Sequence, residues 1–513
     1  MDSGQANDLG VDTSSTMNDM RQMLRFLAIL FWLVAAPALA DSRFNFSIDF
    51  PVDSGLPTGT LFHVGDTAGA GFAYANNTHR TTNPRVVTFF AKGNAGVKVT
   101  DLGKPFADSV TFGLVSMKDE LLAVAYSPGF LRPRQYDKPS RTWRDVSMPG
   151  WKDGVTNLGG FQVVNNRPLY LYTDAPNLYF DGNAITGDSR FVGKKAYGLL
   201  YAVGKLYLFF QADGPDFMYA CDWMPGKDAV SNCIEASFGI NVWLYSFFPV
   251  AGGAGITDTL GNVWRLSSSG ALTTYRQADS ASYQIYSALL FQGQWWAGHY
   301  PSGSLVRWPD LTAVDPAIGK QPCSDSAARE AQSLGIHMGK IVAGVWPWGE
   351  VWTGSPGNSW ELLTRVFQNP ANVCGAAPFI AQAVAAGAEM NALGQRIFGI
   401  ANWDTGIAVS ATMKNPYYAT ALDRLTAPER APYGSVFLIE QDYELSCTIP
   451  GSGAMELTFV LTSTTMDIRK DGTVLCSRLI DGTTLQNLTS PAIIGDGPWG
   501  SFTGKIKANA ILH

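Results

Sequence analysis

Two polar residue pairs carry side chains that suit acid–base chemistry. His299 and Tyr300 place an imidazole beside a phenol in a segment with Gly and Pro, and His79 stands beside Arg80 in the longest loop. Elimination from a uronate polysaccharide needs a base, an acid for the leaving oxygen and a cation to neutralise the carboxylate. His299, Tyr300, His79 and Arg80 are therefore the predicted catalytic residues of a polysaccharide lyase. The alternative is a structural histidine in a tight loop, since adjacent strand residues point to opposite faces.

Acidic and aromatic residues recur in other loops at similar positions. Aromatic rings stack on sugars, and carboxylates accept hydrogen bonds from sugar hydroxyls. The predicted carbohydrate-binding residues are Asp174, Asp213, Asp258, Trp346, Trp348, Glu350, Trp403 and Asp404. Two of the carboxylates could also form the pair that a glycosidase needs. The competing interpretation is turn chemistry, in which an Asp side chain binds the neighbouring backbone.

The elements that must position these residues form a repeat of about 47 residues. Each copy has an apolar strand, a turn that often contains Gly, a second strand, a polar loop and a third strand with aromatics or Arg. The turns fall near residues 69, 119, 166, 204, 253, 293, 339 and 394. Repeats of this length with about four strands are typical of β-propeller blades. The sequence predicts seven or eight blades over residues 44–425, and stacked β-sandwiches are the alternative.

Two segments depart from the repeat. Residues 326–334 contain helix formers after a Ser cap and predict a helical insertion, and residues 380–392 predict a short helix or an inner strand. From residue 433 to 513, closely spaced strand-like segments predict a separate C-terminal β-sandwich. Its last segment, residues 501–511, resembles the last strand of laminin-G-like lectin domains, which implies a carbohydrate-binding role.

The first 40 residues predict export. Arg21 and Arg25 precede an apolar run from Phe26 to Ala36, and Ala38-Leu39-Ala40 matches a signal-peptidase site. The run is shorter than the about 20 residues that span a bilayer, although an uncut anchor is the alternative. We expect a secreted or periplasmic chain that begins near Asp41 and has no membrane span after cleavage.

Six cysteines follow the predicted leader, and an even number in an exported chain predicts disulfides. Sequence order suggests the pairs Cys221–Cys233, Cys323–Cys374 and Cys447–Cys476, one of fifteen connectivities. A metal site is not predicted, because the chain has no CxxC motif and only 5 His. No motif for a cofactor is present.

Composition limits the partners. The net charge of −6 argues against nucleic acid, which requires a basic surface. With 12% aromatics and only 16% charged residues, the chain favours short strands and tight turns over long helices. The sequence thus predicts an exported β-propeller that acts on polysaccharide as a lyase or glycoside hydrolase. The alternative is a non-enzymatic carbohydrate-binding or adhesion protein that uses the same rim.

Overall fold

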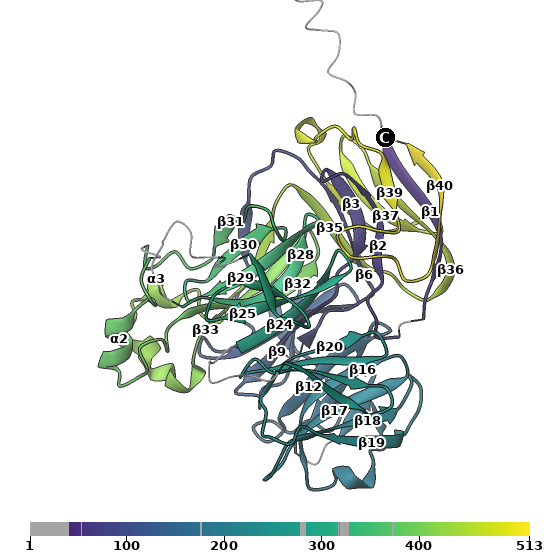
Figure 1. Ribbon diagram of the computed structural model, residues 1–513. Helices are drawn as coiled ribbons and strands as arrows, with labels where there is room; N and C mark the ends of the chain where they lie inside the picture. The colour runs from purple at the N-terminus through teal and green to yellow at the C-terminus, as the bar shows by residue number, and fades with distance from the viewer. Residues whose placement is uncertain are drawn as a thin grey trace, which may run out of the picture.

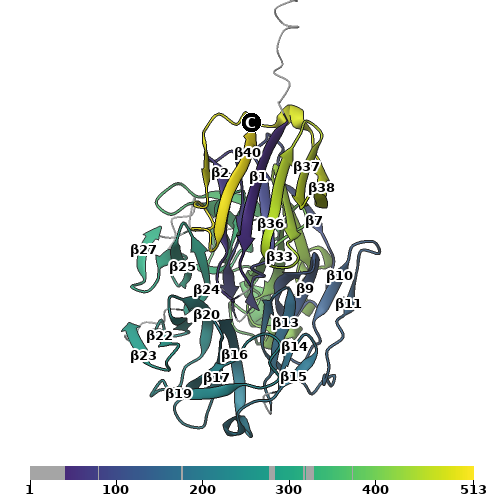
Figure 2. The same cartoon turned by 90° about the vertical axis from the view of Figure 1, so that its right-hand side faces the viewer.

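The computed structural model describes residues 41–512 except 53, 79, 175–176, 277–283, 316–317, 319–327 and 372–373. The predicted leader and His79 lie outside the described residues. The fold is all-β, as predicted, and its strands form a large ring of sheets beside a smaller unit of two sheets (Figures 1 and 2). No helix in this described part of the chain is long and apolar enough to cross a membrane.

Seven four-stranded antiparallel sheets form the ring within the described residues. Three of them are β8 (Thr111–Met117), β9 (Glu120–Ser127), β10 (Arg134–Asp137), β11 (Thr142–Asp145); β12 (Leu158–Val164), β13 (Arg167–Tyr172), β14 (Leu178–Phe180), β15 (Asn183–Ile185); and β16 (Lys195–Ala202), β17 (Lys205–Gln211), β18 (Phe217–Asp222), β19 (Ser231–Ser237). Two more are β20 (Leu244–Val250), β21 (Gly253–Asp258), β22 (Val263–Ser267), β23 (Leu272–Arg276); and β24 (Gln284–Phe291), β25 (Gln294–Tyr300), β26 (Leu305–Arg307), β27 (Thr312–Asp315). The last two are β28 (Glu330–His337), β29 (Lys340–Trp346), β30 (Glu350–Gly354), β31 (Glu361–Arg365); and β32 (Gln395–Trp403), β33 (Gly406–Met413), β34 (Val436–Glu440), β7 (Lys98–Asp101).

The first strand of each sheet lies toward the centre of the ring. From β12 to β32 each first strand contacts the next, β32 contacts β8, and β12 contacts β9 of the sheet that begins with β8, so the ring is closed. The last sheet takes its outer strand, β7, from the beginning of the ring, because β7 pairs with β34. Such a ring, in which every sheet buries both faces against its neighbours, is the arrangement of a β-propeller.

The predicted repeat differs from the structure at both of its ends. Gly394 precedes the first strand of the last sheet, and the turn that matches the others lies at Asp404 and Thr405, between β32 and β33. The copy near residue 69 is outside the ring, since its strands pair in the smaller unit. The sequence pattern does not distinguish these two segments from true copies of the repeat, because both combine Gly with apolar residues as the hairpins of the ring do.

A segment that we call the plug, residues 73–78 and 80–85, fills the centre of the ring. Its strands are β4 (Ala75–Asn77) and β5 (Arg80–Thr81). β4 pairs with β24 and also contacts β20, β28 and β32, whereas β5 pairs with β12 and contacts β8. The plug thus joins two sheets of the ring into one ten-stranded sheet and satisfies backbone groups at their inner edges.

The smaller part, which we call the two-sheet unit, combines both ends of the chain (Figure 2, purple and yellow strands). One sheet contains β1 (Ser42–Phe50), β36 (Gly453–Leu461), β37 (Thr465–Lys470), β38 (Thr473–Leu479) and β40 (Lys505–Leu512). The other contains β2 (Gly59–Val64), β3 (Ala68–Phe72), β6 (Val86–Ala91), β35 (Tyr443–Thr448) and β39 (Ala492–Ile494). A shared core that includes Phe46, Phe62, Phe89 and Phe459 lies between them.

This pairing divides the chain differently from the sequence-based prediction, which placed residues 44–425 in the ring and 433–513 in a separate unit. β1, β2, β3 and β6 belong to the two-sheet unit, and β34 belongs to the ring. The alternating pattern of β1, with Phe44, Phe46 and Ile48 buried, shows that a strand forms here but not which strand it joins.

Helices are short in the described residues: η1 (Ser189–Phe191), α2 (Ile380–Ala385), η2 (Pro416–Arg424), α3 (Ala427–Arg430) and η3 (Gly482–Thr484). The helix α2 was one of the two alternatives predicted for residues 380–392. The helix predicted at 326–334 is wrong for residues 330–334, which lie in the fully buried strand β28. Pairing with β29 and burial on both faces override the helix propensity of this segment.

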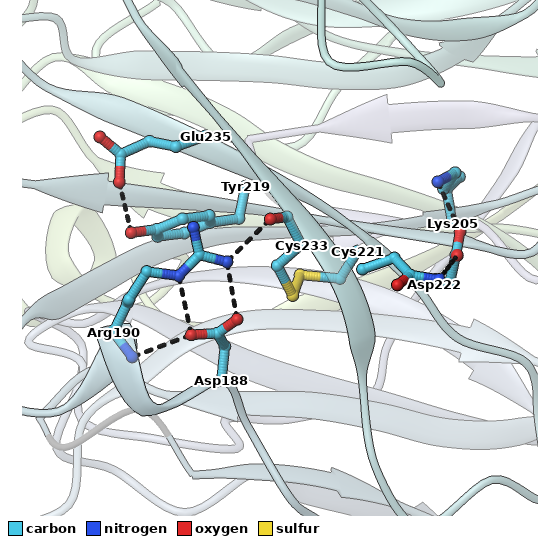
Figure 3. The surroundings of a disulfide bond; sticks show 9 residues. Asp188, Arg190, Lys205, Tyr219, Cys221, Asp222, Cys233 and Glu235 are labelled. Atoms are coloured by element: carbon cyan, nitrogen blue, oxygen red, sulfur yellow. Dashed lines mark hydrogen bonds and ion pairs between the residues drawn. A yellow bond between two sulfur atoms is a disulfide. The ribbon is translucent and has the colours of Figure 1, made fainter.

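Two predicted disulfides are present. Cys221–Cys233 links neighbouring strands β18 and β19, and Cys447–Cys476 links β35 in one sheet of the two-sheet unit to β38 in the other. Figure 3 shows the first, beside Arg190, which binds Asp188 through two hydrogen bonds and donates a third to the carbonyl of Cys233. Cys374 is also disulfide-bonded, while its predicted partner Cys323 lies outside the described residues.

Candidate functional site

The two faces of the ring have different surroundings. The hairpin turns between the first and second strands face the two-sheet unit: Gln292 N–H donates to the carbonyl of Pro498, and Thr448 N–H donates to Asp119 Oδ1. The first strands begin on the opposite face, which we call the open face. The short helices α2 and α3 lie far from the two-sheet unit in Figure 1.

The predicted pair His299–Tyr300 lies at the end of β25, and its side chains have separate surroundings. His299 is buried, and its Nδ1 lies 2.7 Å from Ser302 Oγ. Burial lowers the pKa of His299 to about 4, with a smaller effect of Arg276, so the imidazole is neutral at pH 7. The Tyr300 ring packs 6.1 Å from that of Trp346, and Lys414 Nζ lies 5.5 Å from its centroid.

Arg80 lies in β5 of the plug and is buried, whereas its predicted neighbour His79 is outside the described residues. The Arg80 guanidinium donates from Nη2 to the carbonyl of Ala125, 2.7 Å away, at the end of β9. Burial lowers the pKa of Arg80 to about 10, and the nearby Tyr126 opposes this shift. Arg80 therefore stays charged at neutral pH.

The predicted rim carboxylates lie apart in different sheets, and three of them have local partners. Asp258 is buried, accepts hydrogen bonds from the backbone N–H groups of Leu260 and Asn262, and shapes its own turn. Glu350 accepts a 3.0 Å bond from Trp352 Nε1, and burial raises its pKa. Asp404 pairs with Lys138 at 3.0 Å. Asp174 and Asp213 are exposed.

The predicted aromatic residues Trp346, Trp348 and Trp403 are buried. The connection between β31 and β32, residues 366–394, covers the first two: Trp348 Nε1 donates to the carbonyl of Gly375, and Gly394 lies against Trp346. Trp403 Nε1 donates to the carbonyl of Asp119 on the opposite face of the ring. None of the three presents a free ring to a ligand.

A different set of residues forms a cavity of about 350 Å³, which we call the aromatic pocket. It lies on the open face, between the sheets that begin with β8, β12, β16 and β20. The lining residues are Arg80, Tyr126, Ser127, Pro128, Gly129, Phe130, Asn157, Leu158, Gly159, Thr173, Tyr197, Phe209, Gln211, Trp243, Leu244 and Tyr417. Aromatic walls with a few polar groups between them are typical of ligand sites.

Three of the wall residues combine a large ring with solvent access. Tyr417 is 84% exposed, Trp243 50% and Phe130 43%. Trp243 also packs against Tyr197, with ring centroids 6.4 Å apart, and its Nε1 lies 3.4 Å from the hydroxyl of half-buried Tyr126. The pocket therefore has an exposed aromatic rim above a polar floor formed by Tyr126 and Arg80.

A group of charged residues adjoins this floor; we call Glu330, Arg396 and Lys414 the charged cluster. The Glu330 carboxylate lies 3.0 Å from Arg396 Nη2 and 2.9 Å from Lys414 Nζ. Arg396 lies over the ring of Phe398, which packs 5.3 Å from the ring of Tyr126. Arg396 and Arg80 both act electrostatically on Tyr126, and this links the cluster to the pocket.

Two larger hollows, of about 590 and 530 Å³, lie where the ring meets the two-sheet unit. Some of their charged lining residues pair with each other, such as Arg167 with Asp181 at 3.0 Å and Lys340 with Glu361 at 3.5 Å. Neither has a rim of exposed aromatic rings. The aromatic pocket is therefore the better candidate for a functional site.

The sequence contained a partial signal for this pocket. Tyr126 ends the second strand of the copy whose turn lies near residue 119, immediately before a loop of the kind that carries the predicted site residues. Trp243 and Tyr417 were not singled out, because each stands in a connection that the repeat pattern does not place. Of the predicted site residues that the structure describes, Arg80 alone lines the pocket.

Comparison with known proteins gives structural likeness without sequence relatives. No protein-family model and no curated protein matches the chain. The Dos1 propeller is similar with a TM-score of 0.36 and 10% identity, over 77% of this chain and 97% of that one. The PQQ-bound aldose sugar dehydrogenase of Streptomyces coelicolor is similar with a TM-score of 0.32 and 12% identity, over 69% of this chain and 100% of that one. The computationally designed Ika8 protein is similar with a TM-score of 0.36 and 8% identity, over 76% of this chain and 99% of that one. Because these TM-scores are low, the evidence for the ring is the strand pairing of this chain itself.

Proposed function

We propose that this protein is an exported seven-bladed β-propeller with a β-sandwich built from both chain ends, and that it binds carbohydrate in the aromatic pocket. Each four-stranded sheet of the ring is one blade. The observation that carries the binding function is the exposed rim of Trp243, Tyr417 and Phe130 around a 350 Å³ cavity. Two disulfides in the described chain are consistent with secretion.

Sugar rings present flat patches of C–H groups between hydroxyls, and such patches pack on aromatic faces while polar groups bind the hydroxyls. The aromatic pocket offers both kinds of contact. Gln211 and Asn157 are polar lining residues with amide groups, and Tyr126 has its hydroxyl at the floor. A group of large aromatic residues that is exposed to water and lies outside the hydrophobic core is typical of an interaction site, which favours a ligand-binding role.

A second function, polysaccharide lyase, is favoured by one observation: a phenol and a guanidinium, from Tyr126 and Arg80, meet in the pocket. Burial raises the pKa of Tyr126, so the phenol is protonated at neutral pH and carries the proton that a leaving oxygen would take. The guanidinium would neutralise the substrate carboxylate. A paired-carboxylate glycosidase is less well supported, because no Asp or Glu is among the described residues that line the pocket.

Replacing Trp243 with Ala tests the binding function. We expect the variant to fold normally and to bind its glycan about tenfold more weakly or worse, because truncating an aromatic anchor typically costs about 2 kcal/mol. Isothermal titration calorimetry against a panel of plant, algal and animal oligosaccharides measures this, and Tyr417→Ala should behave similarly. Absorbance of unsaturated uronate products, followed in the same samples, reports lyase activity.

The matched control is Tyr275→Ala. Tyr275 is 46% exposed on β23, the outer strand of its sheet, and does not line the pocket. Its replacement should leave glycan affinity unchanged. Equal loss of affinity in the Trp243 and Tyr275 variants, or binding of no glycan at all by the wild-type protein, would contradict the proposed function.

A further inference from the structure

The open face concentrates positive charge in a protein whose formal net charge is −6. Arg80 lines the aromatic pocket, and Arg396 and Lys414 both lie against the one carboxylate of Glu330. Within the charged cluster, two cations share this one carboxylate. A further carboxylate, Glu389, acts on Lys414 from the surface, where it accepts a 3.4 Å hydrogen bond from Asn415.

The charges are held away from water. The side chain of Glu330 is fully buried, that of Arg396 is 7% exposed and that of Lys414 is 18% exposed. Burial lowers the pKa of Lys414 to about 8, with a smaller contribution from Arg396, while Glu330 opposes this shift. Two cations that share one buried carboxylate give this side of the pocket a positive potential, which attracts an anion.

The position of Arg80 depends on two features that lie far apart in the sequence. The plug carries it through the centre of the ring from the side of the two-sheet unit, and Gly113 in β8 leaves room for its side chain. A Cβ atom at Gly113 would lie 2.8 Å from Arg80 Cγ. Its hydrogen bond to the Ala125 carbonyl then holds the guanidinium beside the floor of the pocket.

We propose that the aromatic pocket binds an acidic sugar, whose carboxylate or sulfate group lies against Arg80 while its rings pack on Trp243 and Tyr417. This inference rests on the proposed carbohydrate-binding function and narrows it to one class of ligand. A guanidinium is suited to the task because it is planar, stays charged when buried and binds two oxygens of one anion at once. The charged cluster behind Tyr126 adds to the positive potential that the anion meets.

The first experiment changes the ligand and leaves the protein intact. Binding to oligogalacturonate is compared with binding to its methyl ester, and binding to heparin oligosaccharides with binding to their desulfated forms, together with neutral cello-oligosaccharides. We expect the more highly charged member of at least one pair, the free uronate or the sulfated oligosaccharide, to bind at least tenfold more tightly than its methyl-esterified or desulfated counterpart. Its affinity should also fall as salt is raised, because the charge contact is partly screened. The two pairs separate a carboxylate ligand from a sulfate ligand.

The second experiment changes Arg80. Arg80→Met removes the charge and keeps most of the side-chain volume, and Arg80→Lys keeps the charge without the planar fork. We expect the Met variant to lose the preference for the charged member of the pair, and the Lys variant to keep part of it. Trp243→Ala should weaken the binding of both sugars of the pair by the same factor. If the Met variant does not fold, the ligand comparison alone decides.

The outcomes separate this inference from the function on which it rests. Equal affinity for charged and neutral members, or binding of neutral oligosaccharides only, would overturn the acidic-sugar inference and leave carbohydrate binding in place. Binding of no member of the panel would count against both. A preference for the charged member that survives in Arg80→Met would also overturn the assignment, because the charge would then be recognised elsewhere.

Discussion

Burial decides what single residues of this protein can do. His299 and Arg80 were predicted as members of one catalytic group, but the structure gives them different roles. His299 binds Ser302 within its own loop, whereas Arg80 lies on the floor of the pocket. Solvent exposure and hydrogen-bond partners therefore decide whether a titratable side chain identified in a sequence belongs to a functional site.

His299 should make the stability of the protein depend on pH. Its pKa of about 4 in the folded state lies below the value of about 6.5 in an unfolded chain. The unfolded state therefore binds more protons between pH 4 and 6.5, so the free energy of unfolding falls as pH is lowered through this window and is fully retained above it. The contribution of His299 to this fall between pH 7 and 5 is about 2 kcal/mol.

Urea unfolding at several pH values checks this expectation with His299→Gln as the comparison. The Gln side chain can keep a hydrogen bond to Ser302 and does not titrate. We expect the stability of the variant to fall less steeply below pH 6.5 than that of the wild type. Parallel curves for the two proteins would mean that His299 is not protonated on unfolding in this range.

The plug is the element that the sequence analysis could not recognise. Its residues Asn76 and Asn77 have no periodicity and little hydrophobicity, and they resemble an ordinary loop. Their role depends on strands far along the chain: the Asn77 amide accepts a bond from Leu334 N–H and donates one to the Leu334 carbonyl, at 3.0 and 3.1 Å. Asn76 Oδ1 accepts from the N–H of Phe247.

Asn77→Ala should therefore destabilise the protein by about 2–4 kcal/mol, because it leaves a buried N–H and a buried carbonyl of Leu334 without these partners. Chemical denaturation measures the change. Asn183→Ala is the control, since Asn183 is exposed and its amide makes only a 3.4 Å bond. A loss at Asn77 no larger than that at Asn183 would show that the plug contributes little to the ring.

Hairpins within one sheet were predictable, and contacts between distant segments were not. The turn before Lys205 was read correctly because Gly204 and the apolar residues after it lie within one hairpin. Trp346 was a predicted carbohydrate-binding residue, and it is buried because residues distant in the sequence, Tyr300 and Gly394, pack against it. Trp243 was missed for a similar reason, since its exposure depends on the packing of neighbouring sheets and not on its own strand.

The whole molecule is interlocked by its two chain ends. β1 pairs with both β36 and β40, and β7 pairs with β34, so neither the ring nor the two-sheet unit is encoded by one continuous stretch of sequence. His337 in the ring and Glu444 in β35 form a buried contact between the two parts, with Nδ1 and Oε2 3.0 Å apart. The two parts should therefore unfold together.

A chain that ends after Ala431 should fail to unfold cooperatively, although the sequence predicted a separate C-terminal β-sandwich from residue 433 onward. It would lack β34, which lies between β33 and β7, and also β35 to β40 of the two-sheet unit. Calorimetry and circular dichroism of this shortened chain, beside the full mature chain, test the expectation. A sharp unfolding transition in the shortened chain would show that the ring is stable without β34.

The pairing of β1 with β40 also sets an order for folding. Six of the seven ring sheets, between residues 111 and 365, can form as their residues emerge, because each is built from strands close in sequence. Arg43, however, must wait for Leu512, its partner in the other strand. Contacts of such large sequence separation form slowly, because a long loop must close first. During synthesis, β1 therefore stays without its partners until almost the entire chain has appeared, and its alternating phenylalanines are exposed for that whole time. A chaperone that shields this strand would be most needed then.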